Sequence, residues 1–80
     1  MPPRPQYTRV IVADVIAKIR SGEYPPGSKL PSVSEMEAIY GCSSQPIKNA
    51  LRELAIRGYT EGHVGKGTFV VADPPSATPS

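Results

Sequence analysis

The sequence has few of the residues that characterise secreted or membrane-bound proteins. Its 80 residues include one cysteine, one histidine and no tryptophan. A lone cysteine forms no intrachain disulfide, which fits a reducing cytoplasm. No apolar run approaches the roughly 18 residues that a membrane span needs, and no apolar signal core follows the N-terminal residues.

Residue groups that would indicate catalysis or metal binding are missing as well. The sequence has no Ser/His/Asp set, no phosphate-binding loop and no paired acids of a kind that would suggest catalysis. Cys42 and His63 lack the spacing of metal ligands. We interpret Cys42 as a buried small hydrophobe, with redox sensing as the alternative, and His63 as a surface residue of a strand. The sequence therefore predicts neither an enzyme nor a bound metal or cofactor.

Charge is nearly balanced overall but unevenly distributed. Nine Lys and Arg residues stand against seven Asp and Glu, so the net charge of +2 is weak evidence for a nucleic-acid partner. Residues 43–60, however, carry Lys48, Arg52 and Arg57 against Glu53 alone. This stretch is therefore where we expect a polyanionic partner to lie.

The chain is long enough for one small domain, and both of its ends are rich in proline. Residues 1–6 read MPPRPQ and residues 73–80 read DPPSATPS. Proline lacks an N–H group and fixes φ, so these segments continue neither a helix nor a sheet. We expect a disordered arm over 1–6, a domain over 7–72, and a tail or a linker to another domain over 73–80.

Apolar residues at helical spacing predict a first helix from about Thr8 to Arg20. Thr8 is the expected N-cap, and Gly22 is expected to follow the end of the helix. The Pro25–Gly27 segment then forces a turn, and Lys29-Leu30 could form a very short strand.

A second helix is expected after Pro31. Ser32 followed by Glu35 matches a capping box, in which each residue's side chain accepts from the other's backbone N–H. Gly41 ends this helix because glycine adopts the left-handed conformation without a Cβ penalty. The expected apolar face consists of Met36, Ile39 and Tyr40.

A third helix is expected after a tight turn through Cys42. Ser43 is the predicted N-cap, Pro46 is tolerated in the first turn, and Gly58 ends the helix. Its predicted buried stripe consists of Ile47, Ala50, Leu51, Leu54 and Ala55.

Beyond Gly58 the apolar period changes to two. Residues 59–63 and 68–72 are expected to form a hairpin whose tip is 64–67, where two glycines allow a tight reversal. Two helices joined by a tight turn and followed by a glycine-rich hairpin are typical of a winged helix-turn-helix. The predicted fold class is therefore α+β, with three helices and a small antiparallel sheet, the wing.

Over residues 8–71 the sequence resembles the N-terminal DNA-binding domain of GntR-family transcriptional regulators. The proline-rich flanks are similar to those of actinomycete proteins, among which plasmid transfer repressors of this family occur. The resemblance is carried, in order, by Ser21-Gly22, Pro26-Gly27, Leu30-Pro31-Ser32, Glu35, Tyr40-Gly41-Cys42-Ser43, Ala50-Leu51, Leu54, Gly58 and Gly65-Lys66-Gly67-Thr68-Phe69-Val70.

The sequence departs from the family pattern where the family carries arginines. Ser34 stands where an arginine usually follows the Leu-Pro-Ser triplet, and Ser44 and Lys48 replace two arginines of the recognition helix. The resemblance implies a retained fold with a different operator sequence.

The resemblance implies sequence-specific binding of duplex DNA for transcriptional regulation, as a repressor. Helix 44–57 would enter the major groove, and the wing, 59–72, would contact the DNA backbone or the minor groove. Phosphate contacts would also come from Arg4 and Arg9. Base reading would come from Gln45, Lys48 and Asn49, since amides pair with adenine and cations with guanine. The candidate site residues are Ser32, Ser34, Ser43, Ser44, Gln45, Lys48, Asn49, Arg52, Val64, Gly65 and Lys66.

The resemblance also implies a larger cytoplasmic, nucleoid-associated bacterial regulator. A C-terminal domain would bind an effector and form a homodimer on a near-palindromic operator, whereas this domain alone would be a monomer. Two other functions stay open. A small excisionase-like architectural DNA factor could be complete at this length, and a winged helix could bind a protein through its wing or through Ile56 on the third helix.

Overall fold

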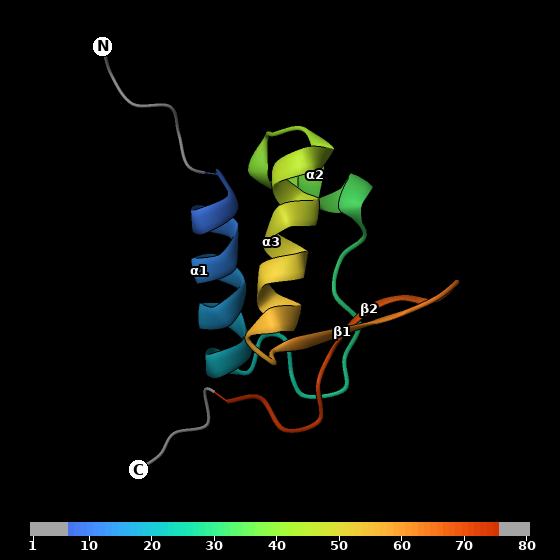
Figure 1. Cartoon of the computed structure of the whole chain (residues 1–80). Coiled ribbons are helices and arrows are strands. Elements are labelled where there is room, and N and C mark those ends of the chain that lie inside the picture. The colour runs from blue at the N-terminus through green and yellow to red at the C-terminus, as the bar shows by residue number, and fades with distance from the viewer. Residues whose placement is uncertain (1–6, 76–80) are drawn as a thin grey trace.

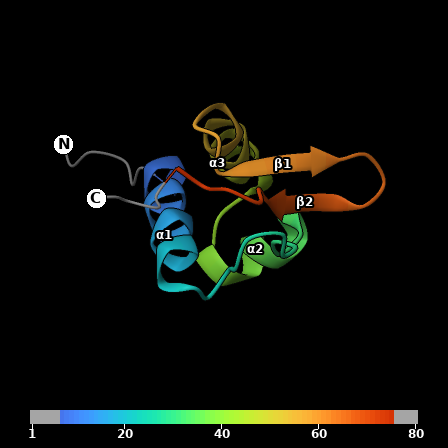
Figure 2. The ribbon, with the colours of Figure 1, turned by 90° about the horizontal axis from the view of Figure 1, so that it is seen from below.

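The computed structural model describes residues 7–75, which form three helices followed by a two-stranded hairpin. Figures 1 and 2 show α1 on one side of α3, with α2 across the start of α3 and the hairpin extending away from α1. The predicted α+β winged helix-turn-helix is confirmed. The arm at 1–6 and residues 76–80 lie outside the described residues. The elements are α1 (Tyr7–Ser21), α2 (Val33–Tyr40), α3 (Ser44–Ile56), β1 (Thr60–His63) and β2 (Gly67–Val70).

The first helix supplies the largest part of the core and begins at Tyr7. Thr8 therefore lies inside the helix, and its predicted role as N-cap is wrong. Its hydroxyl donates instead to the carbonyl of Pro46, 3.3 Å away in the first turn of α3. The Thr8 hydroxyl therefore bonds to a residue 38 positions away in the chain, and not to the backbone of its own helix. The buried residues of α1 are Ile11, Val12, Val15 and Ile19.

The second helix has the predicted capping box. Ser32 donates its backbone N–H to Glu35 Oε1 at 2.7 Å, and Ser32 Oγ accepts from the Glu35 N–H at 3.1 Å. Gly41 ends the helix in the left-handed conformation, with φ of 65°. Met36 is fully buried, but Ile39 is 54% exposed, so the prediction for Ile39 is wrong. The eight-residue helix lies at the edge of the core, and Ile39 borders a shallow hollow that opens to solvent.

The third helix passes through the middle of the molecule. Ser43 occupies the N-cap position without a side-chain cap bond. Ile47, Ala50 and Leu54 are fully buried, as predicted. Ala55 is exposed, which corrects its predicted place in the buried stripe, because α1 and the base of the wing cover α3 on its other side.

The hairpin pairs Thr60 with Val70 and His63 with Gly67 in antiparallel register. Its strands are shorter than predicted, because Tyr59 donates to the carbonyl of Leu54 at 2.9 Å and thereby closes the end of α3. The predicted strand at 29–30 is reduced to one bridge, between Lys29 and Phe69. Beyond residue 72, the predicted domain limit, Pro74 is still buried.

A polar contact joins α1 to α2. Tyr40 Oη donates to Asp14 Oδ2 at 2.6 Å, and Lys18 Nζ lies 3.1 Å from the same oxygen. The Tyr40 hydroxyl bond and the neighbouring Lys18 lower the pKa of Asp14, whereas burial and the Asp14 carboxylate raise the pKa of Tyr40. The charged carboxylate is thus the form that stabilises the fold.

Tyr40→Phe is expected to lower the free energy of unfolding at pH 7 by about 1 kcal/mol, a value discounted for the partial exposure of Asp14. Because the folded-state pKa of Asp14 is depressed, this stabilisation is present above its ordinary pKa of 3.8 and is lost as the pH falls through the folded-state pKa. Urea denaturation at pH 7 and at successively lower pH measures the difference. Tyr7→Phe, on the exposed start of α1, is the matched control. An equal loss in both variants would contradict the assignment.

Candidate nucleic-acid interface

The outer face of α3 presents four polar side chains in two successive turns. Gln45, Lys48 and Arg52 are exposed, and Asn49 is half-buried. Within residues 7–75, neither Lys48 nor Arg52 forms an ion pair, whereas Arg57 is paired with Glu53 at 2.8 Å. Two free cations on a helix face are suited to a polyanionic partner.

The amides of Gln45 and Asn49 act as one unit on this face. Gln45 Nε2 donates to Asn49 Oδ1 at 3.0 Å, one turn apart along α3. The bond links the two amides and leaves the Asn49 amino group and the Gln45 carbonyl available. An amide amino group or carbonyl oxygen can pair with the acceptor or the donor that adenine presents in the major groove.

Of the four serines predicted to contact DNA at the helix starts, one is hydrogen-bonded within a capping box and another is half-buried. Ser32 gives its backbone N–H to Glu35, so only its hydroxyl hydrogen remains to donate. Ser44, in the first turn of α3, is half-buried. Ser34 and Ser43 are exposed beside them. The structure therefore places Ser32 and Ser34 at the start of α2 and Ser43 and Ser44 at the start of α3, with Ser44 the least exposed of the four.

The tip of the wing lies within a continuous exposed run, residues 61–67. Val64 is 104% exposed, and Gly65 and Lys66 are also exposed. Lys66 donates its backbone N–H to the carbonyl of His63 at 2.9 Å, which closes the turn. Gly65, with φ of 77°, adopts a conformation that side chains other than glycine rarely take. Lys66 thus lies in the turn that joins β1 to β2, at the end of the hairpin that extends away from α1 in Figure 2.

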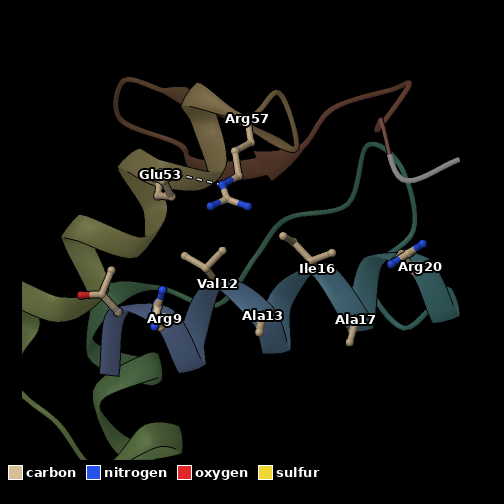
Figure 3. Close-up of a pocket in the computed structure, with 9 residues that line it drawn as sticks. Arg9, Val12, Ala13, Ile16, Ala17, Arg20, Glu53 and Arg57 are labelled. Atoms are coloured by element: carbon tan, nitrogen blue, oxygen red, sulfur yellow. Dashed lines mark hydrogen bonds and ion pairs between the residues drawn. The ribbon is translucent and has the colours of Figure 1, made fainter. Parts of the chain in front are cut away.

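Some residues named from the sequence lie elsewhere. Arg9 lines a hollow between α1 and α3, together with Arg20 and Arg57 (Figure 3). Arg4 is outside the described residues. Cys42 is half-buried and packs against the core. His63 is exposed on β1, as predicted for a surface strand residue, with its Nε2 3.5 Å from Glu61 Oε2.

The sequence analysis missed Lys29. This residue lies beside the wing, in a hollow that also borders Ser32, Leu51 and Lys66. Its position in the sequence, directly before the Leu-Pro-Ser triplet, does not indicate that it lies next to the wing. The contact arises because the loop after α1 runs antiparallel to β2, with Lys29 opposite Phe69.

Within residues 7–75, no three His, Cys, Asp or Glu side chains lie close enough together to hold a metal ion. No helix in that range is both long and apolar enough to cross a membrane.

Three helices, a tight turn between the last two and a hairpin after the third define a winged helix-turn-helix. Residues 7–70 match the family described as "Bacterial regulatory proteins, gntR family". The chain belongs to this family, which confirms the resemblance.

Similar proteins agree with this assignment. The chain is 42% identical over 68 residues to the histidine utilization repressor of Pseudomonas aeruginosa, which covers 85% of this chain and 27% of that protein. It is similar to the structure of AraR(DBD) in complex with operator ORX1, with 29% identity, a TM-score of 0.78, and coverage of 86% of this chain and 82% of that one. A GntR-family regulator from Listeria monocytogenes has 27% identity and a TM-score of 0.82, over 91% of this chain and 63% of that one. The chain thus spans about a quarter of the length of the repressor.

Proposed function

We propose that this chain binds duplex DNA in a sequence-specific manner, as the operator-reading domain of a bacterial transcriptional repressor. The observation that carries the proposal is the outer face of α3, where the hydrogen-bonded amides of Gln45 and Asn49 lie beside Lys48 and Arg52, two cations that form no ion pair within residues 7–75. Family membership supports it, as do a relative named as a repressor and a neighbour solved on its operator.

Each element has its own part in this proposal. The first turns of α3 enter the major groove, where Gln45, Lys48 and Asn49 contact base edges. Arg52 and the wing tip, with Lys66, contact the backbone or the minor groove. Backbone contacts fix the register of the protein on the duplex, and α3 supplies the sequence preference.

Assembly and regulation belong to the same proposal. A domain that follows this one would bind the effector and hold two copies on a near-palindromic operator in the cytoplasm. The domain alone would be a monomer that binds one half-site weakly. In the full regulator, linking two copies would raise the effective concentration of the second copy at its half-site and so strengthen binding to the whole operator.

Salt dependence tests DNA binding directly. If three to five cationic side chains each displace counterions from a phosphate, log K should fall against log salt with a slope of about −3 to −5. Affinity would then drop on the order of a hundredfold between 50 and 200 mM salt. The measurement is fluorescence anisotropy with a duplex selected from a random library, and the scrambled duplex is the control. A flat salt response, or equal affinity for both duplexes, would contradict the proposal.

A further inference from the structure

A second hollow in the molecule lies between the wing and the start of α2. It has a volume of about 600 Å³. Leu30, Val33 and Leu51 provide its apolar lining, and Lys29 and Lys66 are the cations that border it. Among residues 7–75, no Asp or Glu lines this hollow. A hollow lined by apolar side chains and two lysines, with no carboxylate, is suited to an anion carried on an apolar group.

The backbone holds Lys29 in place at this hollow. Lys29 bridges to Phe69, and the next residue, Leu30, donates its N–H to the carbonyl of Thr68 at 2.8 Å. The loop after α1 therefore runs as a third, very short strand beside β2. The Cα of Lys29 is fixed by sheet hydrogen bonds, although the residue lies in a loop.

The side chain of Lys29 crosses the wing at Gly67. A Cβ built on Gly67 would lie 2.8 Å from Lys29 Cε and 3.7 Å from Lys29 Nζ. A side chain at Gly67 would therefore displace the end of the Lys29 side chain, and the φ of 119° at Gly67 itself favours glycine. The end of the Lys29 side chain thus lies beside Gly67 of β2, and both residues line the hollow.

We infer that this hollow seats one phosphodiester of the DNA backbone and that Lys29 is its principal cation. The inference rests on the proposed function and adds an anchor between the two contacts already described, the recognition helix and the wing tip. The ammonium group binds the phosphate as a point charge. The apolar lining accepts the adjoining deoxyribose, and the Ser32 hydroxyl is a second donor nearby.

Glu35 is the carboxylate that faces Lys29 from α2. It accepts the Ser32 backbone N–H at 2.7 Å, and it is not within ion-pair distance of Lys29. Bonds from Ser32 lower the pKa of Glu35, and the charge of Lys29 contributes to the same shift. The Glu35 oxygen is thus held by the cap, and the Lys29 ammonium group stays available to a phosphate.

Lys29→Met tests the seat because methionine keeps an unbranched apolar stem over Gly67 and removes the charge. The slope of log K against log salt should become less steep by about 0.9, the value for one phosphate contact. With this difference in slope, the affinity of the variant relative to wild type should be about eightfold lower at 0.1 M salt than at 1 M salt. The loss should be equal for the operator and for operators with single base changes. Lys29→Arg should restore both slope and affinity, and circular dichroism verifies folding.

Arg20→Gln is the matched control, since it removes one positive charge at the far end of α1. Equal losses in Lys29→Met and Arg20→Gln would show an effect of net charge and overturn the seat. An operator series in which single phosphates are replaced by neutral methylphosphonates identifies the phosphate. One replacement should weaken the wild-type protein and leave Lys29→Met unaffected. If every replacement weakens both proteins equally, Lys29 contacts no phosphate. If wild type itself shows no salt dependence, the proposed function fails instead.

Discussion

Asn49→Ala is expected to relax the selectivity of DNA binding at one operator position by about 1–3 kcal/mol, or roughly 5- to 150-fold. The physical reason is the bond from Gln45 Nε2 to Asn49 Oδ1, which presets both amides before DNA arrives. Loss of Asn49 removes its own amino group and also frees Gln45 to rotate. Gln45→Ala should therefore relax selectivity at the same or an adjacent base pair, and the double variant should lose less than the sum of the two.

The measurement is a titration of each variant against the operator and against operators with single base changes. Lys66→Ala is the control from the wing. It should weaken all sequences alike and make the salt slope less steep by about one unit. If Lys66→Ala changed base preference while Asn49→Ala and Gln45→Ala did not, the wing would be the reader and the assignment of α3 would be wrong.

Leu54→Ala is expected to lower the free energy of unfolding by about 2–5 kcal/mol, through lost transfer free energy and the remaining cavity. Leu54 is 0% exposed on the face of α3 covered by α1 and the wing base, and its carbonyl accepts the N–H of Tyr59. A domain this small has a total stability of only a few kcal/mol, so the variant should be largely unfolded near room temperature.

Urea denaturation followed by circular dichroism measures this loss. Ile56→Ala is the matched control, because Ile56 lies on the same helix and is 73% exposed. Its effect should stay within about 0.5 kcal/mol. Similar losses in both variants would mean that α3 does not bury Leu54 in solution. Under conditions in which both proteins are fully folded, Ile56→Ala should bind DNA with unchanged affinity. The Ile56 side chain lies neither in the core nor on the face of α3 that reads DNA.

Several features of the fold depended on neighbours in the chain and could be predicted from the sequence alone. The Ser32–Glu35 capping box and the left-handed Gly41 involve residues within a turn of each other, and the structure has both. The hairpin follows from the alternating period and its glycines, since the turn sets the pairing register locally. Spacing on one helix also placed Gln45, Lys48 and Asn49 on a common face, which is why the reading residues could be proposed without a structure.

Contacts between distant parts of the chain decided the rest. The sequence predicts Thr8 as an N-cap, because nothing near it in the chain indicates another partner for its hydroxyl. The actual partner, the Pro46 carbonyl, lies 38 residues away. Ile39 and Ala55 have the spacing of buried residues, but burial requires a neighbouring element, and among residues 7–75 none covers those sides of α2 and α3. Lys29 is an ordinary loop lysine in the sequence. Only the folded sheet brings Lys29 beside Gly67. Helix periodicity and turn chemistry act over a few residues, whereas a groove between two elements exists only once those elements are packed together.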